Sequence, residues 1–287
     1  MEAQEKNNYE FILVDDPAPY VRRITMNRPE KRNALNNGLR KEIFNALYIA
    51  DEDESVRVTI IRGAGKCFSA GYDLSVDNRI DRPWFTSGGD GNWARHVVKG
   101  WFEIWDLAKP VIAQVHGFCL AGGSELTASC DLAYVSDDAQ IGYPPIRSMA
   151  APDMQYYPWM VGMRNAMEIM LTGNSMTGRE AVEMGYANRC FPKEELEART
   201  LEMAGRVAKI PTDLNQLNKR TVHRAMEIMG IRTAIRAGTE IHALGWYQPS
   251  SMEYMSTLRK DLNKAFTERD GKFGDYRSGI KKEDKAK

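Results

Sequence analysis

Two glycine-containing segments, residues 67–74 (CFSAGYDL) and 109–126 (KPVIAQVHGFCLAGGSEL), hold the residues best suited to chemistry. An apolar strand that leads through Gly122-Gly123 into a helix leaves backbone N–H groups without partners at the helix start, where the dipole also favours negative charge. Glycine lets a ligand oxygen approach the backbone closely. Either segment alone is equally well explained as a tight turn, but together they indicate a site for an oxyanion.

Glu125 is the first candidate for proton transfer. It follows Gly122 by one helical turn, which brings its carboxylate near the expected oxyanion donors. A carboxylate in that place can move a proton at a carbon beside the stabilised anion. A glutamate in the first turn of a helix is also an ordinary partner for the helix dipole.

The two segments match the two signatures of the enoyl-CoA hydratase/isomerase (crotonase) superfamily, which the chain resembles over nearly all of residues 20–191. The resemblance implies that one backbone N–H from each segment binds the thioester oxygen of an acyl-CoA. Carried over by position, the donors are Tyr72 and Gly122, and Glu125 matches a catalytic glutamate of the hydratases. Three neighbours of Tyr72 are then expected at the substrate, namely Ala70, Asp73 and Leu74.

Residues 27–36 (NRPEKRNALN) resemble the N-terminal signature of the same superfamily. The resemblance implies that the backbone around Ala34 and Leu35 lies against the adenine of coenzyme A. Nearby basic side chains would then face the phosphates, and these are Arg28, Lys31 and Arg32. By itself such a basic cluster indicates only a solvated turn. Coenzyme A is part of the substrate, so no separate cofactor and no metal are expected.

Pro145 marks a departure from the family pattern. Hydratases of this family use a second glutamate twenty positions after the first, and here that position holds Pro145, which has no proton to give. Asp153 is the substitute, since dienoyl-CoA isomerases and some dehalogenases of the superfamily place a working aspartate eight residues further on. Its alignment is open, because the following segment is shorter than in typical hydratases, and aspartate after proline is also common in turns. Tyr143 is either a proton donor or a wall of the pocket.

Aromatic residues are numerous around the expected acyl site. Trp101 and Trp105, four residues apart, indicate core packing, while the whole set permits a pocket for a bulky or cyclic acyl group. His116 is expected to hold the second glycine turn by hydrogen bonding. The aromatic set comprises Trp84, Trp93, Trp101, Trp105, Tyr156, Tyr157 and Trp159.

The elements that position these residues indicate an α/β fold. Short apolar runs bounded by Gly, Pro, Asn or Asp predict strands, and they alternate with helical patterns before a mostly helical second half. The predicted strands are 11–14, 21–26, 58–62, 111–116 and 132–135. The predicted helices are 36–49 with Asn36 as N-cap, 92–107, 166–171, 178–184, 194–208, 213–229, 231–247 and 251–266. The resemblance implies a crotonase-like spiral of β-β-α units over residues 1–211, which carries the CoA and acyl site, and a helical oligomerisation region over 212–287 that forms trimers.

Composition excludes several classes of protein. The 287 residues are 43% hydrophobic, enough for a large core, and 39 basic side chains balance 39 acidic ones. The chain is therefore not expected to bind nucleic acid or a membrane surface. Without a long apolar stretch or a signal-peptide pattern it is expected in the cytoplasm. The cysteines have no Cys-x-x-Cys spacing, so free thiols are expected rather than a zinc site.

These residues predict an enzyme that stabilises an enolate of an acyl-CoA, most simply an enoyl-CoA hydratase or isomerase with a non-standard second catalytic position. Two other reactions remain open, hydrolysis of a carbon–carbon bond in a β-keto acyl-CoA and decarboxylation of an acyl-CoA. A catalytically silent CoA-binding protein is the alternative from another class. The expected partners are the acyl-CoA substrate and further copies of the chain, in a homotrimer or a dimer of trimers.

Overall fold

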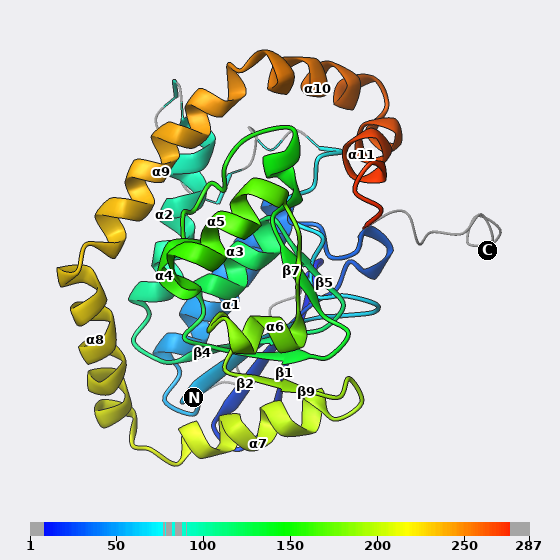
Figure 1. Cartoon of the computed structure of the whole chain (residues 1–287). Coiled ribbons are helices and arrows are strands. Elements are labelled where there is room, and N and C mark those ends of the chain that lie inside the picture. The colour runs from blue at the N-terminus through cyan, green and yellow to red at the C-terminus, as the bar shows by residue number, and fades with distance from the viewer. Residues whose placement is uncertain (1–8, 77, 79–81, 84–87, 90, 276–287) are drawn as a thin grey trace.

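A six-stranded sheet with strand order β1-β2-β3-β4-β6-β9 forms the centre of the computed structural model, which describes residues 9–76, 78, 82–83, 88–89 and 91–275 (Figure 1). Strand β1 is antiparallel to β2, and the remaining neighbours are parallel. Parallel neighbours need crossover connections, and helices supply them here. The strands are β1 (Ile12–Ala18), β2 (Val21–Met26), β3 (Val58–Gly63), β4 (Val111–Val115), β6 (Leu132–Ser136) and β9 (Arg189–Phe191).

Both faces of this sheet are buried, as is usual for parallel sheets. On β3, Ile60 packs in the cluster that includes helix α7 (Leu196–Ala208), whereas its neighbour Ile61 belongs to the main core on the other face. On β4, Ile112 likewise packs on the α7 side of the sheet and Ala113 packs in the main core. The alternation follows from the two-residue period of a strand, and it fixes which side of the sheet faces the site.

A second, three-stranded sheet was not predicted. It contains β5 (Phe118–Leu120), β7 (Gln140–Gly142) and β8 (Met176–Thr177), and like β9 its strands are too short to show a two-residue period in the sequence. Leu120 pairs with Gly142 in the parallel β5–β7 register. This pairing brings the residues just before Gly122 beside the segment that leads to Pro145.

The predicted helices of the first half are confirmed. Helix α1 (Asn37–Glu52) begins after Asn36, whose side chain accepts a hydrogen bond from the Leu39 N–H at 2.8 Å. Helix α2 (Asn92–Asp106) and helix α3 (Gly122–Ser129) follow. The connecting elements are the 3-10 helices η1 (Pro29–Lys31) and η2 (Pro144–Arg147), together with α4 (Tyr157–Met160), α5 (Gly162–Thr172) and α6 (Gly178–Glu183).

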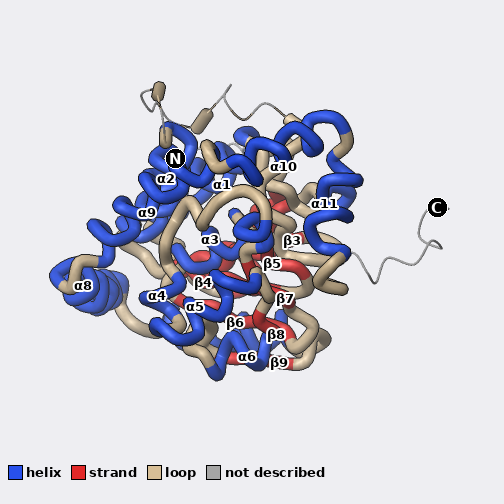
Figure 2. The backbone as a smooth tube through the Cα atoms, turned by 45° about the horizontal axis from the view of Figure 1, so that its top comes forward, coloured by secondary structure: helices blue, strands red, loops and turns tan. Residues whose placement is uncertain are grey.

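Four C-terminal helices form an arc around the body and return over it (Figures 1 and 2). They are α8 (Thr212–Ile228), α9 (Ile231–Trp246), α10 (Pro249–Lys260) and α11 (Leu262–Gly271). The prediction of one helix over 251–266 is wrong. The chain leaves helical geometry at Asp261, with φ −152° and ψ 100°, and the Asp261 side chain accepts from the Lys264 N–H at 2.9 Å. Aspartate at an N-cap favours a fresh helix start.

A buried ion-pair network fastens α11 to η2. Arg147 lies 3.3 Å from the carboxylate of Asp270 and 2.7 Å from that of Asp275. The side chains of Arg147 and Asp270 are 1% and 2% exposed, and Arg269 also pairs with Asp270 at 2.7 Å. The last described helix is therefore held against the segment that contains Pro145.

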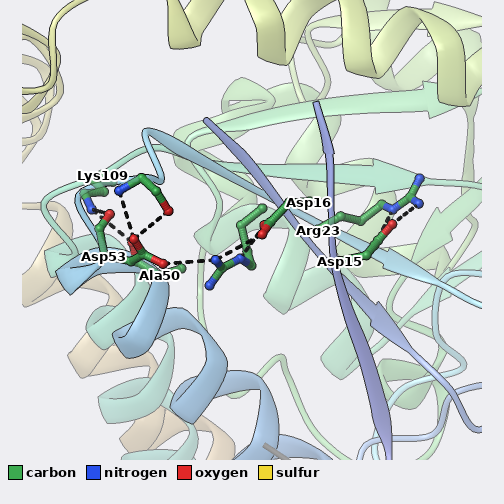
Figure 3. Close-up of polar contacts among 8 residues, drawn as sticks. Asp15, Asp16, Arg23, Ala50, Asp53 and Lys109 are labelled. Carbon is green, nitrogen blue, oxygen red and sulfur yellow. Dashed lines mark hydrogen bonds and ion pairs between the residues drawn. The ribbon is translucent and has the colours of Figure 1, made fainter. Parts of the chain in front are cut away.

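Polar contacts also tie the strand edge and the end of α1 to the body (Figure 3). Arg23 pairs with Asp15 across the β1–β2 hairpin at 2.5 Å. The Lys109 ammonium donates to the carbonyls of Ala50 and Asp53, which fixes the start of β4. Among the described residues, no helix combines the length and the apolar character needed to span a bilayer. The cytoplasmic location stays a prediction.

Candidate active site

The two glycine-containing segments lie side by side. Ser69 and Cys119 form a parallel β-bridge, in which the Ser69 N–H donates to Phe118 and the Leu120 N–H donates to Ser69, both at 3.0 Å. Gly71 has a φ of +99°, and a Cβ atom there would lie 2.9 Å from the Leu120 carbonyl oxygen and 3.4 Å from the backbone nitrogen of the second turn. Only glycine fits both the conformation and the space.

Each turn contains a backbone amide that is available to a ligand oxygen. The N–H groups of Tyr72 and Gly122 have no acceptor within the described part of the chain, whereas those of Ala70, Asp73 and Ala121 donate to backbone carbonyls. The Leu35 backbone bonds to the residues on either side of Tyr72, so the Tyr72 N–H points away from that bridge. The Gly122 N–H is at the start of α3, where no intrahelical acceptor exists.

Glu125 is completely buried behind these turns, with an exposure of 0%. Its Oε2 accepts from the Tyr72 hydroxyl at 2.6 Å and from the Trp101 indole N–H at 3.3 Å, and its Oε1 accepts from the Met154 N–H at 3.1 Å. Burial raises the pKa of Glu125 to about 8, the negative charge of Asp153 adds to the rise, and the hydrogen bonds oppose it. A carboxyl with such a pKa can both hold and release a proton near neutral pH.

The Tyr72 ring packs over the backbone of Gly122, where an added Cβ would lie 2.7 Å from Tyr72 Cζ. The Trp101 indole donates to the Tyr72 hydroxyl at 3.1 Å, so the predicted core packing of Trp101 is accompanied by two polar contacts. The Trp93 and Tyr72 rings are in a T-shaped arrangement with their centroids 5.1 Å apart. Aromatic surfaces thus enclose the Glu125 carboxyl.

Arg40 is a site residue that the sequence analysis missed. It is 1% exposed, and its guanidinium carbon lies 6.0 Å from the ring centroid of Tyr72 and 5.9 Å from that of Trp101. A buried cation there offsets the negative charge of the carboxylates. The available signal was its position on α1, because Arg40 shares the buried face of the helix with Ile43 and Leu47.

Asp153 has one carboxylate oxygen available. The residue is 1% exposed, and its Oδ2 accepts from the Tyr143 hydroxyl at 3.0 Å. Its Oδ1 has no hydrogen-bond donor among the residues that the structure describes. A buried carboxylate oxygen without a partner is unusual, and it is available to a ligand.

His242 on α9 lies beside that oxygen, with its Nε2 3.2 Å from Asp153 Oδ1. The Trp246 indole donates to the same Nε2 at 2.7 Å, and His242 Nδ1 lies 2.7 Å from the Ala151 carbonyl. A carbonyl oxygen only accepts, so the ring proton is on Nδ1 and the Nε2 lone pair is used by Trp246. His242 therefore has no N–H for Asp153 in this arrangement. Sequence spacing gave no signal for this long-range contact.

A cavity of about 890 Å³ opens between the glycine turns and the C-terminal helices. Glu125 is not among the residues that line it, because Tyr72 lies between them. Of the predicted site residues, the lining includes Arg32, Ala70, Tyr72, Leu74, Tyr143, Pro145 and Asp153. The C-terminal helices contribute Trp246, Met255, Arg259, Phe266, Arg269 and Asp270. The size is within the range of small-molecule sites.

Other predicted site residues hold the loops together. Arg28 and Asp73 form a buried ion pair at 3.0 Å, and Leu35 is fully buried with its backbone bonded to Gly71 and Asp73. Contact of Arg28, Asp73 and Leu35 with substrate stays a prediction. Their burial and their bonds within the protein do not favour it. Ala34 is half-buried and Lys31 is exposed beside them.

Two further expectations have plain outcomes. His116 lies 2.9 Å from the Gly65 carbonyl oxygen, in the loop before the first segment, so its hydrogen bond is not made within the second glycine turn where it was expected. Trp84 lies outside the described residues.

Comparison with known proteins identifies the class. The family model "Enoyl-CoA hydratase/isomerase" matches residues 19–245. The chain is 35% identical to EchA13 of Mycobacterium tuberculosis over 264 residues, which cover 84% of this chain and 82% of that protein.

Solved structures agree with this match. One is an enoyl-CoA hydratase from Mycobacterium smegmatis, with a TM-score of 0.85 and 27% identity over 94% of this chain and 96% of that one. Another is an enoyl-CoA hydratase/isomerase from Xanthobacter autotrophicus Py2, with a TM-score of 0.83 and 33% identity. The match covers 92% of this chain and 99% of that one. The fold is that of the crotonase-type enzymes, which act on acyl-CoA. The chain belongs to the enoyl-CoA hydratase/isomerase family.

Proposed function

We propose that this enzyme forms an enolate from an acyl-CoA thioester. The N–H groups of Tyr72 and Gly122 bind the thioester oxygen, and the Glu125 carboxyl takes up and returns a proton of the carbon next to the thioester carbonyl, either directly or through a neighbouring group. The observation that carries this proposal is the pair of unused amides on two adjacent turns. One donor of this kind contributes about 10²–10³ in rate.

We further propose that the overall reaction is hydration or isomerisation of an enoyl-CoA, with Asp153 as the second acid–base group. Pro145 lines the cavity where the hydratases' second glutamate is expected, and it has no exchangeable proton. Asp153 lines the same cavity and has an unpartnered oxygen. A carboxylate so placed can accept a proton or position a water molecule.

The proposed substrate contacts outside the reacting centre involve the CoA moiety. Arg32 lines the cavity and Lys31 is exposed beside it, so both are available to phosphate groups. The adenine is proposed to lie near Ala34. Since the proton chemistry needs only these side chains, we propose that no separate cofactor or metal takes part.

We propose a homotrimer or a dimer of trimers as the working assembly. Large apolar side chains are exposed on α5, on α8 and the residue that follows it, and on α9, and such surfaces favour burial against another subunit. They include Met163, Leu171, Leu217, Val222, Ile228, Met229, Ile241 and Leu244. Sedimentation velocity measures the assembly directly, and a monomer at micromolar concentration contradicts this part of the proposal.

Proton exchange tests the enolate chemistry. The enzyme is incubated with a saturated acyl-CoA in D₂O, and deuterium in the acyl group is followed by mass spectrometry. Glu125→Gln is expected to abolish incorporation. The matched control is Glu103→Gln, because Glu103 also accepts from a tyrosine, Tyr48, at 3.2 Å, but does so at the surface.

Product analysis then separates the reactions. With an enoyl-CoA, hydration adds the mass of water, whereas isomerisation leaves the mass unchanged. Cleavage of a β-keto acyl-CoA or loss of CO₂ would replace this proposal with one of the other reactions. Absence of exchange with every thioester tried, while CoA binding persists, identifies a catalytically silent binding protein.

A further inference from the structure

Tyr72 separates the cavity from Glu125. Tyr72 is one of the residues that line the cavity, and its hydroxyl donates to Glu125 Oε2 at 2.6 Å. Glu125 is 0% exposed, and its other oxygen is bonded to the Met154 backbone. In this structure the carboxyl has no direct contact with the space where an acyl chain can bind.

We propose that the Tyr72 hydroxyl is the group that exchanges the proton with the acyl carbon, and that Glu125 works through it. The inference deepens the proposed function and rests on it. In the forward step the carbon–hydrogen bond of the substrate breaks, and its proton goes to the Tyr72 oxygen as the tyrosine's own proton moves to the Glu125 carboxylate. The bonding electron pair moves into the enolate, whose oxygen is held by the two backbone amides. Reversal returns every proton, so the step needs no other reactant.

The groups around the Tyr72 hydroxyl can stabilise negative charge on its oxygen during proton transfer. The Trp101 N–H donates to the Tyr72 oxygen at 3.1 Å, which stabilises negative charge there during the transfer. The guanidinium of Arg40 lies 6.0 Å from the ring centroid and favours the same charge. A free phenolate does not accumulate, because burial and the charges of Glu125 and Asp153 hold the pKa of Tyr72 well above its ordinary value. The two proton movements are therefore coupled in one step.

One residue would then contribute twice to the same reaction. Its backbone N–H is one of the two proposed oxyanion donors, and its side chain donates a hydrogen bond to Glu125. The simpler interpretation is that the Tyr72 hydroxyl only satisfies a buried carboxylate and that the ring is a wall. A phenylalanine would also form a wall, so the two interpretations differ in what the oxygen does.

Tyr72→Phe removes the hydroxyl and leaves the backbone donor in place. Deuterium incorporation into a saturated acyl-CoA is expected to fall about 10²-fold or more, the usual contribution of a positioned acid–base group. The dissociation constant for the thioester and the unfolding temperature are measured alongside, to show that the variant is folded and binds. Tyr48→Phe is the matched control, because Tyr48 donates to Glu103 at the protein surface, and it is expected to exchange at the wild-type rate.

A fluorinated tyrosine at position 72 distinguishes a proton carrier from a hydrogen-bond partner. 3,5-Difluorotyrosine has a more acidic phenol and nearly the same shape. If the hydroxyl carries the proton, the maximal rate of exchange changes with the acidity of the phenol. If the hydroxyl only donates a hydrogen bond to Glu125, the pKa of the profile moves while the maximal rate stays the same.

The outcomes separate this inference from the proposed function. If the wild type exchanges, Glu125→Gln does not, and Tyr72→Phe stays within about threefold of wild type, then Glu125 reaches the substrate itself and the relay is overturned. If the wild type exchanges with no thioester, the proposed function fails and the relay fails with it. Loss of exchange in both variants, with binding retained, supports the relay.

Discussion

The raised pKa of Glu125 predicts that this residue destabilises the fold as the pH rises. The pKa of the carboxyl is about 8 in the folded protein against 4.5 for an ordinary glutamate. At a pH below both pKa values the carboxyl is protonated in the folded and in the unfolded chain, and its titration does not change the free energy of unfolding. Between them the unfolded chain loses its proton first, so the free energy of unfolding falls with rising pH and levels off above the folded value.

The magnitude follows from the two pKa values. Their difference corresponds to about 5 kcal/mol above pH 8, of which about 3 kcal/mol is reached by pH 7. Glu125→Gln removes this pH dependence, because glutamine does not titrate. It also replaces one acceptor oxygen with an NH₂ group, and the resulting mismatched hydrogen bonds lower the free energy of unfolding by about 1–3 kcal/mol at every pH. The stability of the variant relative to wild type should therefore improve by about 3 kcal/mol between about pH 5 and pH 8.

Urea unfolding of both proteins across this pH range measures the effect. A single protein concentration is used throughout, because association stabilises folded chains by mass action. The informative quantity is how the difference in unfolding free energy between the variant and the wild type changes with pH. The cost of the mismatched hydrogen bonds is the same at every pH, so it cancels from this change. A difference that stays level from pH 5 to pH 8 would refute the reasoning, because it would mean that Glu125 ionises in the folded protein as an ordinary glutamate does.

Three other substitutions test separate parts of the site. Asp153→Asn should lower turnover of an enoyl-CoA by about 10²-fold or more and leave deuterium exchange into a saturated thioester intact; unchanged turnover excludes Asp153 as the second acid–base group. Gly71→Ala should abolish exchange, because the added methyl group would lie 2.8 Å from the Cβ atom of Ala121 in the second turn. Gly230→Ala is the control, because Gly230 has a similar φ of +100° but open space around it, and this variant should lose only stability. Arg147→Met should reduce the free energy of unfolding by about 1–3 kcal/mol in urea titrations, because Asp270 loses one of its two arginine partners and keeps Arg269, and wild-type stability would show that the network is not needed.

The sequence was a good guide wherever a single segment carries its own signal. The strand at Val21–Met26 and the start of α1 after Asn36 are in the structure as predicted, because β-branched runs and side-chain caps act locally. Strand β8 has only two residues and depends on its partner β7. The break at Asp261 had a local signal, an N-cap aspartate, which continuing helical periodicity obscured.

The site itself was predictable in part for the same reason. The backbone donors at Tyr72 and Gly122 belong to recognisable turns, but the direction of the Tyr72 side chain depends on Glu125 and Trp101, which come from two different helices. The contact of His242 with Asp153 joins α9 to a distant loop. Such contacts are set by packing between elements, and no spacing in one segment encodes them.

The division of the cavity wall has a consequence for how such an enzyme can diversify. The proposed proton-transfer groups, Tyr72, Glu125 and Asp153, all lie before α4 in the sequence, whereas Met255 and Phe266 line the same cavity from α10 and α11. Changes in those two helices can lengthen, shorten or reshape the room for the acyl chain without disturbing the reacting centre. Under the proposed function, acyl-chain selectivity and bond chemistry therefore belong to separate stretches of the polypeptide, and each can vary while the other stays fixed.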